Sequence, residues 1–235
     1  MPISRSLRVP GRVLVAILMG LFVLSSVGMV VSNSNRLPSA IQSQPWFKGF
    51  LSHTTMWTIS LILMLFISKG KLRSVGFCRG KKYKMTSIVI PGTVVGVAMA
   101  TVLRLFPEGP NSSELEYSFV QTIIFISLYA SVSEELLTRG LIQSFLTPLV
   151  AYGFTIFGVR ISLPVLTGAL FFGLMHTALL TTGMALFPVI SIVVFATVLG
   201  LIAGYQRERT GSLIPAIIIH AFGNIGGYCV KMLSV

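Results

Sequence analysis

Long runs of apolar residues recur along this chain and are separated by short polar stretches. The runs do not alternate between apolar and polar positions, so each one predicts a helix. About twenty apolar residues in a helix span the hydrocarbon core of a bilayer, and a backbone in lipid must satisfy its own hydrogen bonds. The pattern therefore predicts an all-α, polytopic bundle of transmembrane helices. We expect seven spans, or eight if a short one is hidden, at 13–32, 50–68, 86–106, 118–140, 163–180, 184–204 and 213–232.

The composition agrees with a membrane protein. Only 10% of the 235 residues are charged and 54% are hydrophobic, whereas about 25% of the residues in soluble domains are charged. The chain is therefore expected to be an integral membrane protein with the lipid bilayer as its surroundings.

The net charge of +12 is concentrated in the loop between the second and third predicted spans. Its basic residues are Lys69, Lys71, Arg73, Arg79, Lys81, Lys82 and Lys84. Cytoplasmic loops of membrane proteins collect Lys and Arg, so this charge indicates topology and not a nucleic-acid partner. The topology places the N-terminus in the cytoplasm and the C-terminus outside. Anionic lipid headgroups would also be attracted to such a loop.

No linker or repeat divides the chain, so we expect one membrane domain, 1–235. The first span is interpreted as an uncleaved anchor, because its apolar core exceeds the 7–15 residues of a signal peptide. Residues 1–106 form three leading spans without a motif, and their His53 is interpreted as an interfacial residue. The segment 118–226 holds every deeply placed ionisable group and is expected to be the catalytic core.

Two pairs of glycines, Gly92 with Gly96 and Gly200 with Gly204, are each four residues apart. Residues at this spacing share one face of a helix. Small residues there allow two helix backbones to approach closely, so we interpret both pairs as packing surfaces.

Three charged residues lie inside or at the end of one predicted span: Glu134, Glu135 and Arg139. Each charge at membrane depth costs about 2.5–3.5 kcal/mol on insertion scales unless a partner offsets it. Glu135 and Arg139 have the spacing of a helical ion pair. Glu134 points in another direction and is expected to face another helix or water, where it could act as a general base. The alternative is that all three residues only hold the bundle together.

Two further residue pairs, each containing a histidine, lie in apolar runs in the second half of the chain. Phe172 and His176 are four residues apart, and so are His220 and Asn224. Each pair shares a helix face, and the two faces could meet at one wet cavity with Glu134. Taken singly, each histidine could equally be an ordinary hydrogen-bonding residue between helices.

The order and spacing of these residues resemble one known family. The motifs are Glu134-Glu135-x-x-x-Arg139, Phe172-x-x-x-His176 and His220-x-x-x-Asn224. They are similar to those of the CAAX prenyl protease and bacteriocin-processing family (CPBP, or Abi) of intramembrane glutamate endopeptidases. The resemblance covers about 118–226 and leaves the first half of the chain unmatched.

The resemblance implies that Glu134 activates a water molecule with help from His176. It also implies that His220 and Asn224 form the oxyanion hole. This division is chemically sensible, because a carboxylate and an imidazole can deprotonate water. Amide and imidazole N–H groups can stabilise the charge that develops on a peptide carbonyl.

The remaining family positions would support the site. Glu135 and Arg139 would orient their helix, and Phe172 would pack against the cavity wall. No cofactor is implied by the resemblance. The alternative is a catalytic zinc ion held by Glu134, His176 and His220, since two histidines and a glutamate are a known zinc ligand set.

The expected depths of these groups in the membrane do not agree. A helix that begins at Leu163 places His176 about 20 Å from the inner edge, whereas Glu134 lies about 10–15 Å deep. A dip of the segment 147–162 into the membrane would remove the difference.

The sequence therefore predicts a protease of a prokaryotic plasma membrane. Its substrate would be a membrane-associated protein or peptide, with a prenylated CAAX protein as one candidate. A non-enzymatic membrane scaffold or immunity protein is the first alternative. A proton or ion carrier is the second, although carriers usually show paired halves and no such repeat is seen here.

Overall fold

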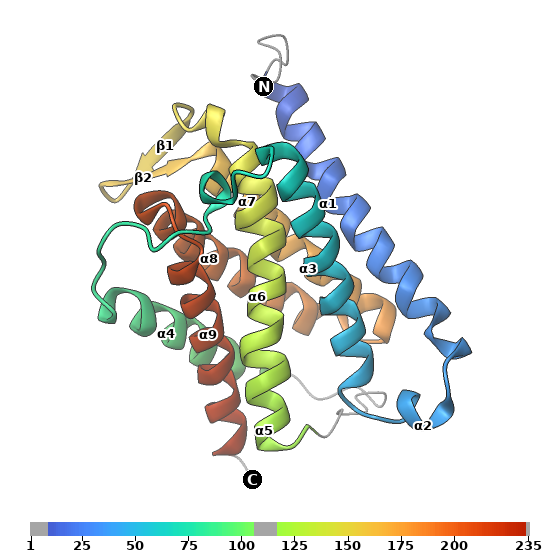
Figure 1. Cartoon of the computed structure of the whole chain (residues 1–235). Helices are drawn as coiled ribbons and strands as arrows, with labels where there is room; N and C mark the ends of the chain where they lie inside the picture. Colours follow the sequence, from blue (N-terminus) through green and yellow to red (C-terminus); the bar gives the residue numbers. More distant parts are fainter. Residues whose placement is uncertain (1–8, 106–116, 234–235) are drawn as a thin grey trace.

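The computed structural model describes residues 9–105 and 117–233, and these form a helical bundle with one small β-hairpin (Figure 1). The expected polytopic helical fold is confirmed. Six helices in the described residues are long and apolar enough to cross a membrane: Val9–Arg36, Phe47–Ser68, Thr86–Leu103, Phe119–Gln143, Leu163–Thr182 and Leu186–Thr210. The seventh expected span is helix α9 (Ile214–Met232), which contains several polar residues and is not among these six.

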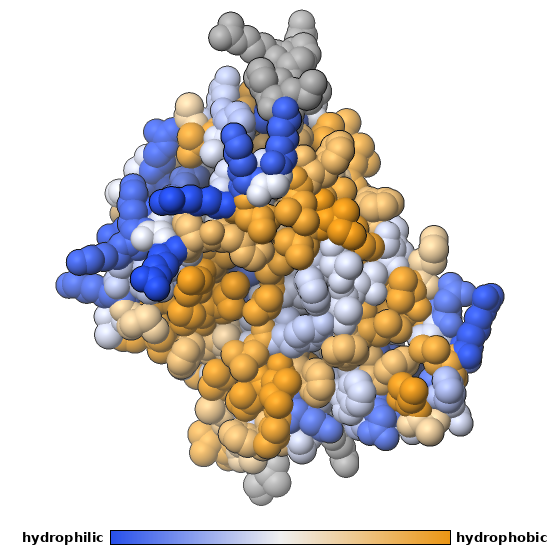
Figure 2. All heavy atoms as spheres, viewed as in Figure 1, coloured by the Kyte–Doolittle hydropathy of each residue, from blue (hydrophilic) through white to orange (hydrophobic). Residues whose placement is uncertain are grey.

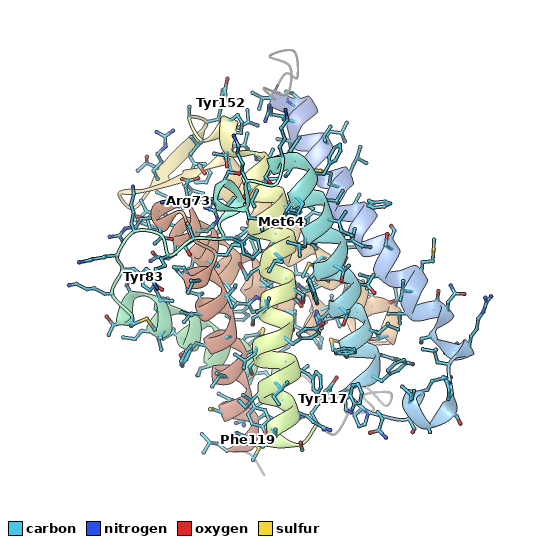
Figure 3. The ribbon with its side chains drawn as sticks, viewed as in Figure 1. Met64, Arg73, Tyr83, Tyr117, Phe119 and Tyr152 are labelled. Atoms are coloured by element: carbon cyan, nitrogen blue, oxygen red, sulfur yellow. The ribbon has the colours of Figure 1, made fainter. Side chains whose placement is uncertain are left out.

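The first half of the chain forms three long helices. These are α1 (Val9–Ser32), α3 (Phe47–Ser68) and α4 (Thr86–Leu103). Short turns join them: η1 (Asn33–Arg36), α2 (Ser39–Gln42) and η2 (Leu72–Val75). Helix α3 packs against the helix that carries Glu134. Gly140 makes room for this contact, because a Cβ there would lie 2.6 Å from Cε of Met64 on α3 (Figure 3).

One continuous helix over residues 119–143 carries the three charged residues. It consists of α5 (Phe119–Gln121), η3 (Thr122–Ala130), α6 (Ser131–Glu135) and η4 (Leu136–Gln143). Ser118 and Gln121 form a reciprocal capping box at its start. The segments η3 and η4 are π-helical, and such turns are frequent at functional sites. Glu134 and Glu135 lie on the short α-helical segment between them.

The rest of the chain starts with η5 (Thr147–Leu149) and a hairpin of β1 (Gly153–Ile156) and β2 (Val159–Ser162). All residues of β1 are exposed. The helices that follow are α7 (Leu163–Met175), η6 (His176–Thr182), α8 (Leu186–Thr210) and α9. The Ser162 hydroxyl accepts a hydrogen bond from the Val165 amide and caps α7. The helix of His176 therefore does begin at Leu163.

The glycine pairs act as packing surfaces, as expected. A Cβ at Gly92 would collide with the carbonyl oxygen of Ile219, and a Cβ at Gly96 with that of Gly223, so α4 and α9 approach backbone to backbone. The second pair lies on α8. The carbonyl of Gly200 accepts from Arg139 across 2.9 Å, and that of Gly204 accepts from Gln143 across 2.9 Å.

The basic loop and the start of α1 lie at the same end of the bundle (Figure 1). Arg12 donates to the carbonyl of Phe145, beyond the end of η4. The loop is joined to the turn between α8 and α9, because the Lys81 amide donates to the Thr210 carbonyl across 2.8 Å. Figure 2 shows hydrophilic side chains gathered toward this end and hydrophobic residues over much of the middle.

Candidate active site

A buried ion pair lies at the centre of the site. Arg139 NH1 donates to Oε1 of Glu135 across 2.7 Å, and both residues are fully buried. The same oxygen also accepts a hydrogen bond from Nδ1 of His220 across 3.0 Å. Glu135 thus connects the 119–143 helix to α9. Breaking a pair of this kind typically costs about 3–5 kcal/mol, because it leaves a buried charge uncompensated.

Arg139 holds two further elements in place. It donates to Oγ1 of Thr138 across 2.7 Å and to the carbonyl of Gly200 on α8 across 2.9 Å. Its guanidinium lies 4.7 Å from the ring centroid of Phe172 on α7. One arginine therefore contacts α7 and α8 while it pairs with Glu135. Together, Glu135 and Arg139 join the 119–143 helix to α7, α8 and α9.

The two neighbouring glutamates have different surroundings. The side chain of Glu135 is 1% exposed, whereas that of Glu134 is 13% exposed. Oε2 of Glu134 lies 3.7 Å from Nε2 of His220, which is beyond direct hydrogen-bonding distance. Since Glu135 accepts from Nδ1, Nδ1 carries a hydrogen and Nε2 is the nitrogen left for chemistry. A carboxylate and an imidazole nitrogen thus face each other with a short gap between them.

Phe172 brings the two motif histidines together. Its ring centroid lies 5.1 Å from that of His220 and 5.1 Å from that of His176, with both rings edge-on to it. Phe172 itself is almost fully buried. One aromatic side chain thus connects His176, at the end of a helix that begins at Leu163, to His220 on α9.

His176 lies at the C-terminal cap of α7 and is partly buried. Its Nδ1 is 2.8 Å from the carbonyl oxygen of Phe172. A carbonyl can only accept, so Nδ1 carries the hydrogen and Nε2 is the acceptor. In the described part of the chain, no hydrogen bond or ion pair joins His176 directly to Glu134.

Asn224 lies one turn beyond His220 on α9 and contacts the 119–143 helix. Its Nδ2 donates to the carbonyl of Ile126 across 2.9 Å and to Oγ of Ser131 across 3.3 Å. The amide that was expected to stabilise an oxyanion is therefore held by two protein acceptors, and the bond to Ser131 is the longer one.

His53 of α3 also reaches this site, which the sequence did not indicate. Its Nδ1 lies 2.8 Å from Oγ of Ser133, the residue before Glu134. His53 was interpreted as an interfacial residue because its position near a predicted helix start shows nothing about the neighbouring helix. No signal in the sequence alone could have placed it beside Glu134.

The candidate zinc set does not come together. Glu134 and His220 face each other, but His176 reaches them only through Phe172. Among the residues that the structure describes, no three His, Cys, Asp or Glu side chains are grouped so that they could hold a metal ion.

The six apolar helices define the class of this protein as a polytopic membrane protein, and its candidate site joins buried carboxylates to a histidine within the bundle. The family model of the Rce1-like type II CAAX prenyl endopeptidases matches residues 116–226. This part of the chain carries all seven motif residues and is similar to the Rce1-like CAAX-type endopeptidases, so the resemblance seen in the sequence is confirmed. The comparisons with curated proteins and with solved structures give no match.

Proposed function

We propose that this protein hydrolyses a peptide bond of a membrane-associated protein or peptide, with Glu134 as the general base. One observation carries the proposal, and it concerns the two adjacent glutamates. Glu135 is buried in an ion pair with Arg139, whereas Glu134 is partly accessible to solvent and lies beside an imidazole nitrogen of His220. A general base must reach a water molecule, and only Glu134 meets that requirement. The similarity of residues 116–226 to the Rce1-like type II CAAX prenyl endopeptidases supports the same reaction class.

The proton path can be written with the residues present. Glu134 takes a proton from water as the oxygen of that water bonds to the peptide carbonyl carbon. The proton can pass to Nε2 of His220, 3.7 Å from the carboxylate. The imidazole, held through Nδ1 by Glu135, then donates from Nε2. The leaving amine receives the proton as the C–N bond breaks, so no net charge is left behind.

His176 and Asn224 complete the proposal. With Nδ1 bound to the Phe172 carbonyl, His176 offers Nε2 as an acceptor for the attacking water. The Asn224 amide, and Nε2 of His220 once it has taken the proton, would stabilise the negative carbonyl oxygen until His220 passes that proton to the leaving amine. Asn224 can do so by exchanging its longer bond, the one to Ser131, for the oxyanion. These steps need no cofactor.

The proposed substrate is a protein or peptide whose cleavage site reaches the membrane, with a prenylated CAAX C-terminus as the leading candidate. We place the enzyme in a prokaryotic plasma membrane with its N-terminus in the cytoplasm. This topology is supported by the basic loop, which lies at the same end as the start of α1.

The decisive experiment compares wild type with Glu134→Gln in proteoliposomes, using prenylated and unprenylated peptides. The isosteric amide cannot accept the proton, so we expect a loss of kcat of at least about 100-fold. Glu208→Gln is the matched control, because Glu208 accepts from Ser162, away from the site. Cleavage by Glu134→Gln at the wild-type rate would refute the proposal. A cellular effect that persists in this variant would favour a scaffold instead.

A further inference from the structure

The leading helix α3 contributes a polar group that the family match does not cover. The match begins at residue 116, and His53 lies more than sixty positions before it. Helix α3 nevertheless packs against α6, which carries Glu134. This contact places an imidazole from the unmatched half of the chain beside the proposed general base.

The hydrogen bond to Ser133 fixes the tautomer of His53. The Ser133 hydroxyl has one hydrogen, and backbone carbonyls of its own helix lie within reach of it: 2.9 Å to Ala130 and 3.1 Å to Tyr129. A hydroxyl that donates to its own helix accepts from a neighbouring ring. The Nδ1 of His53, 2.8 Å away, is then the donor. This leaves Nε2 as an acceptor, and the described residues provide it with no hydrogen bond.

The ring is also held in orientation. It lies edge-on to Tyr129, with the ring centroids 6.3 Å apart. The Tyr129 hydroxyl is in turn fixed by Thr54 across 2.6 Å and by the indole N–H of Trp57 across 2.9 Å. This network occupies one face of α3. The titratable groups near enough to His53 to act on its ring when charged are Glu134 from the 119–143 helix and His220 from α9, and Tyr129 lies against it.

We propose that His53 is a positioning residue for Glu134. Anchored by Ser133, it orients the carboxylate, and its Nε2 can hold the proton that Glu134 takes from the attacking water until it returns to Glu134 for transfer to His220. This inference rests on the proposed function, since it assigns a partner to the same general base. It also gives the leading spans a part in the chemistry. All three histidines of the chain would then be fixed through Nδ1, with Nε2 left for the reaction.

Two substitutions separate the structural role of His53 from its role toward Glu134. Asparagine at this position can still donate to Ser133 through its amide nitrogen, but it cannot hold a proton. We expect His53→Asn to accumulate and melt like wild type, to lose about 100-fold in kcat and to lose one ionisation from its pH–rate profile. Ser52→Ala is the matched control, because Ser52 bonds only to its own helix. A His53→Asn enzyme with the wild-type rate and pH profile would overturn the proposal.

A second measurement does not depend on activity. The chain has only three histidines, so histidine labelled with ¹⁵N in its ring gives three resolvable side chains in the full-length protein. We expect Nδ1 of His53 to carry the hydrogen, and Glu134→Gln to shift the His53 and His220 signals more than those of His176. A His53 signal unchanged by Glu134→Gln would overturn the pairing even if proteolysis is found. A shifted signal in a protein without proteolysis would refute the proposed function and leave the pairing intact.

Discussion

His220 donates from Nδ1 to Oε1 of Glu135 across 3.0 Å, and this single carboxylate oxygen also receives Arg139 across 2.7 Å. The second glutamate of the motif is therefore a structural anchor for the imidazole of another helix. This explains why two adjacent acids occur at membrane depth. One fixes the tautomer of His220, and the other faces the nitrogen that remains.

Glu135→Ala should destabilise the protein by about 3–5 kcal/mol, because Arg139 would be left as an unpaired buried charge. The double variant Glu135→Ala with Arg139→Ala should lose less than the sum of the two single variants, since the residues share one interaction. Thermal unfolding in detergent measures both effects. Additive losses would show that the pair is not coupled.

Phe172→Ala should cost about 3–5 kcal/mol of stability and should also reduce kcat/KM strongly, because the ring contacts Arg139, His176 and His220. Phe171→Ala provides the control. Phe171 is also buried, but a Cβ at Gly20 of α1 would collide with its ring, so it packs toward the leading helix. Both variants should have a lower melting temperature than wild type. Only Phe172→Ala should also have a lower activity per amount of folded protein. Equal activity in the two variants would contradict the bridging role of Phe172.

Gly96→Ala should force α4 and α9 apart, because the new Cβ would collide with the carbonyl of Gly223. Overpacking of this kind typically costs about 1–3 kcal/mol, and the shift would move the helix that carries His220. The expected result is a lower melting temperature and a lower kcat. Gly28→Ala should change neither, since nothing lies within 4 Å of a Cβ at that position. The prediction fails if both substitutions are equally harmless.

Chelators should leave the proteolytic activity unchanged, because the described His, Cys and Glu side chains are not grouped as a metal site. The test is an assay of the purified protein before and after treatment with phenanthroline, together with elemental analysis for zinc. Loss of activity that zinc restores would contradict the proposed metal-free mechanism.

The proposed topology can be tested with reporter fusions. Alkaline phosphatase joined after Leu233 should be active outside the cytoplasm, and green fluorescent protein at the N-terminus should fluoresce inside it. This result follows from the concentration of Lys and Arg in the 69–84 loop. The opposite pair of signals would show that the bundle has the reverse orientation in the membrane.

Much of the fold followed from local properties of the sequence. Apolar runs long enough for a bilayer gave the helices, because hydrophobic length and backbone hydrogen bonding act within one segment. The hairpin in the 147–162 segment was harder to predict from the sequence. Its turn residues were visible, but the exposed hairpin depends on the cross-strand register, in which Phe154 pairs with Ile161. The glycine pairs were correctly interpreted because four-residue spacing fixes a helix face, although the partner helix could not be named.

The sequence by itself determined the membrane class, the helical elements, the family resemblance of about 118–226 and the candidate residues of the site. Only the tertiary structure decided how these residues face one another. It showed that Glu135 and not Glu134 holds His220, that Phe172 bridges two histidines, that Asn224 already has acceptors, and that His53 stands beside Ser133. The physical reason is that spacing fixes the face of each helix, whereas helix rotation and contact are set by packing between segments far apart in the chain.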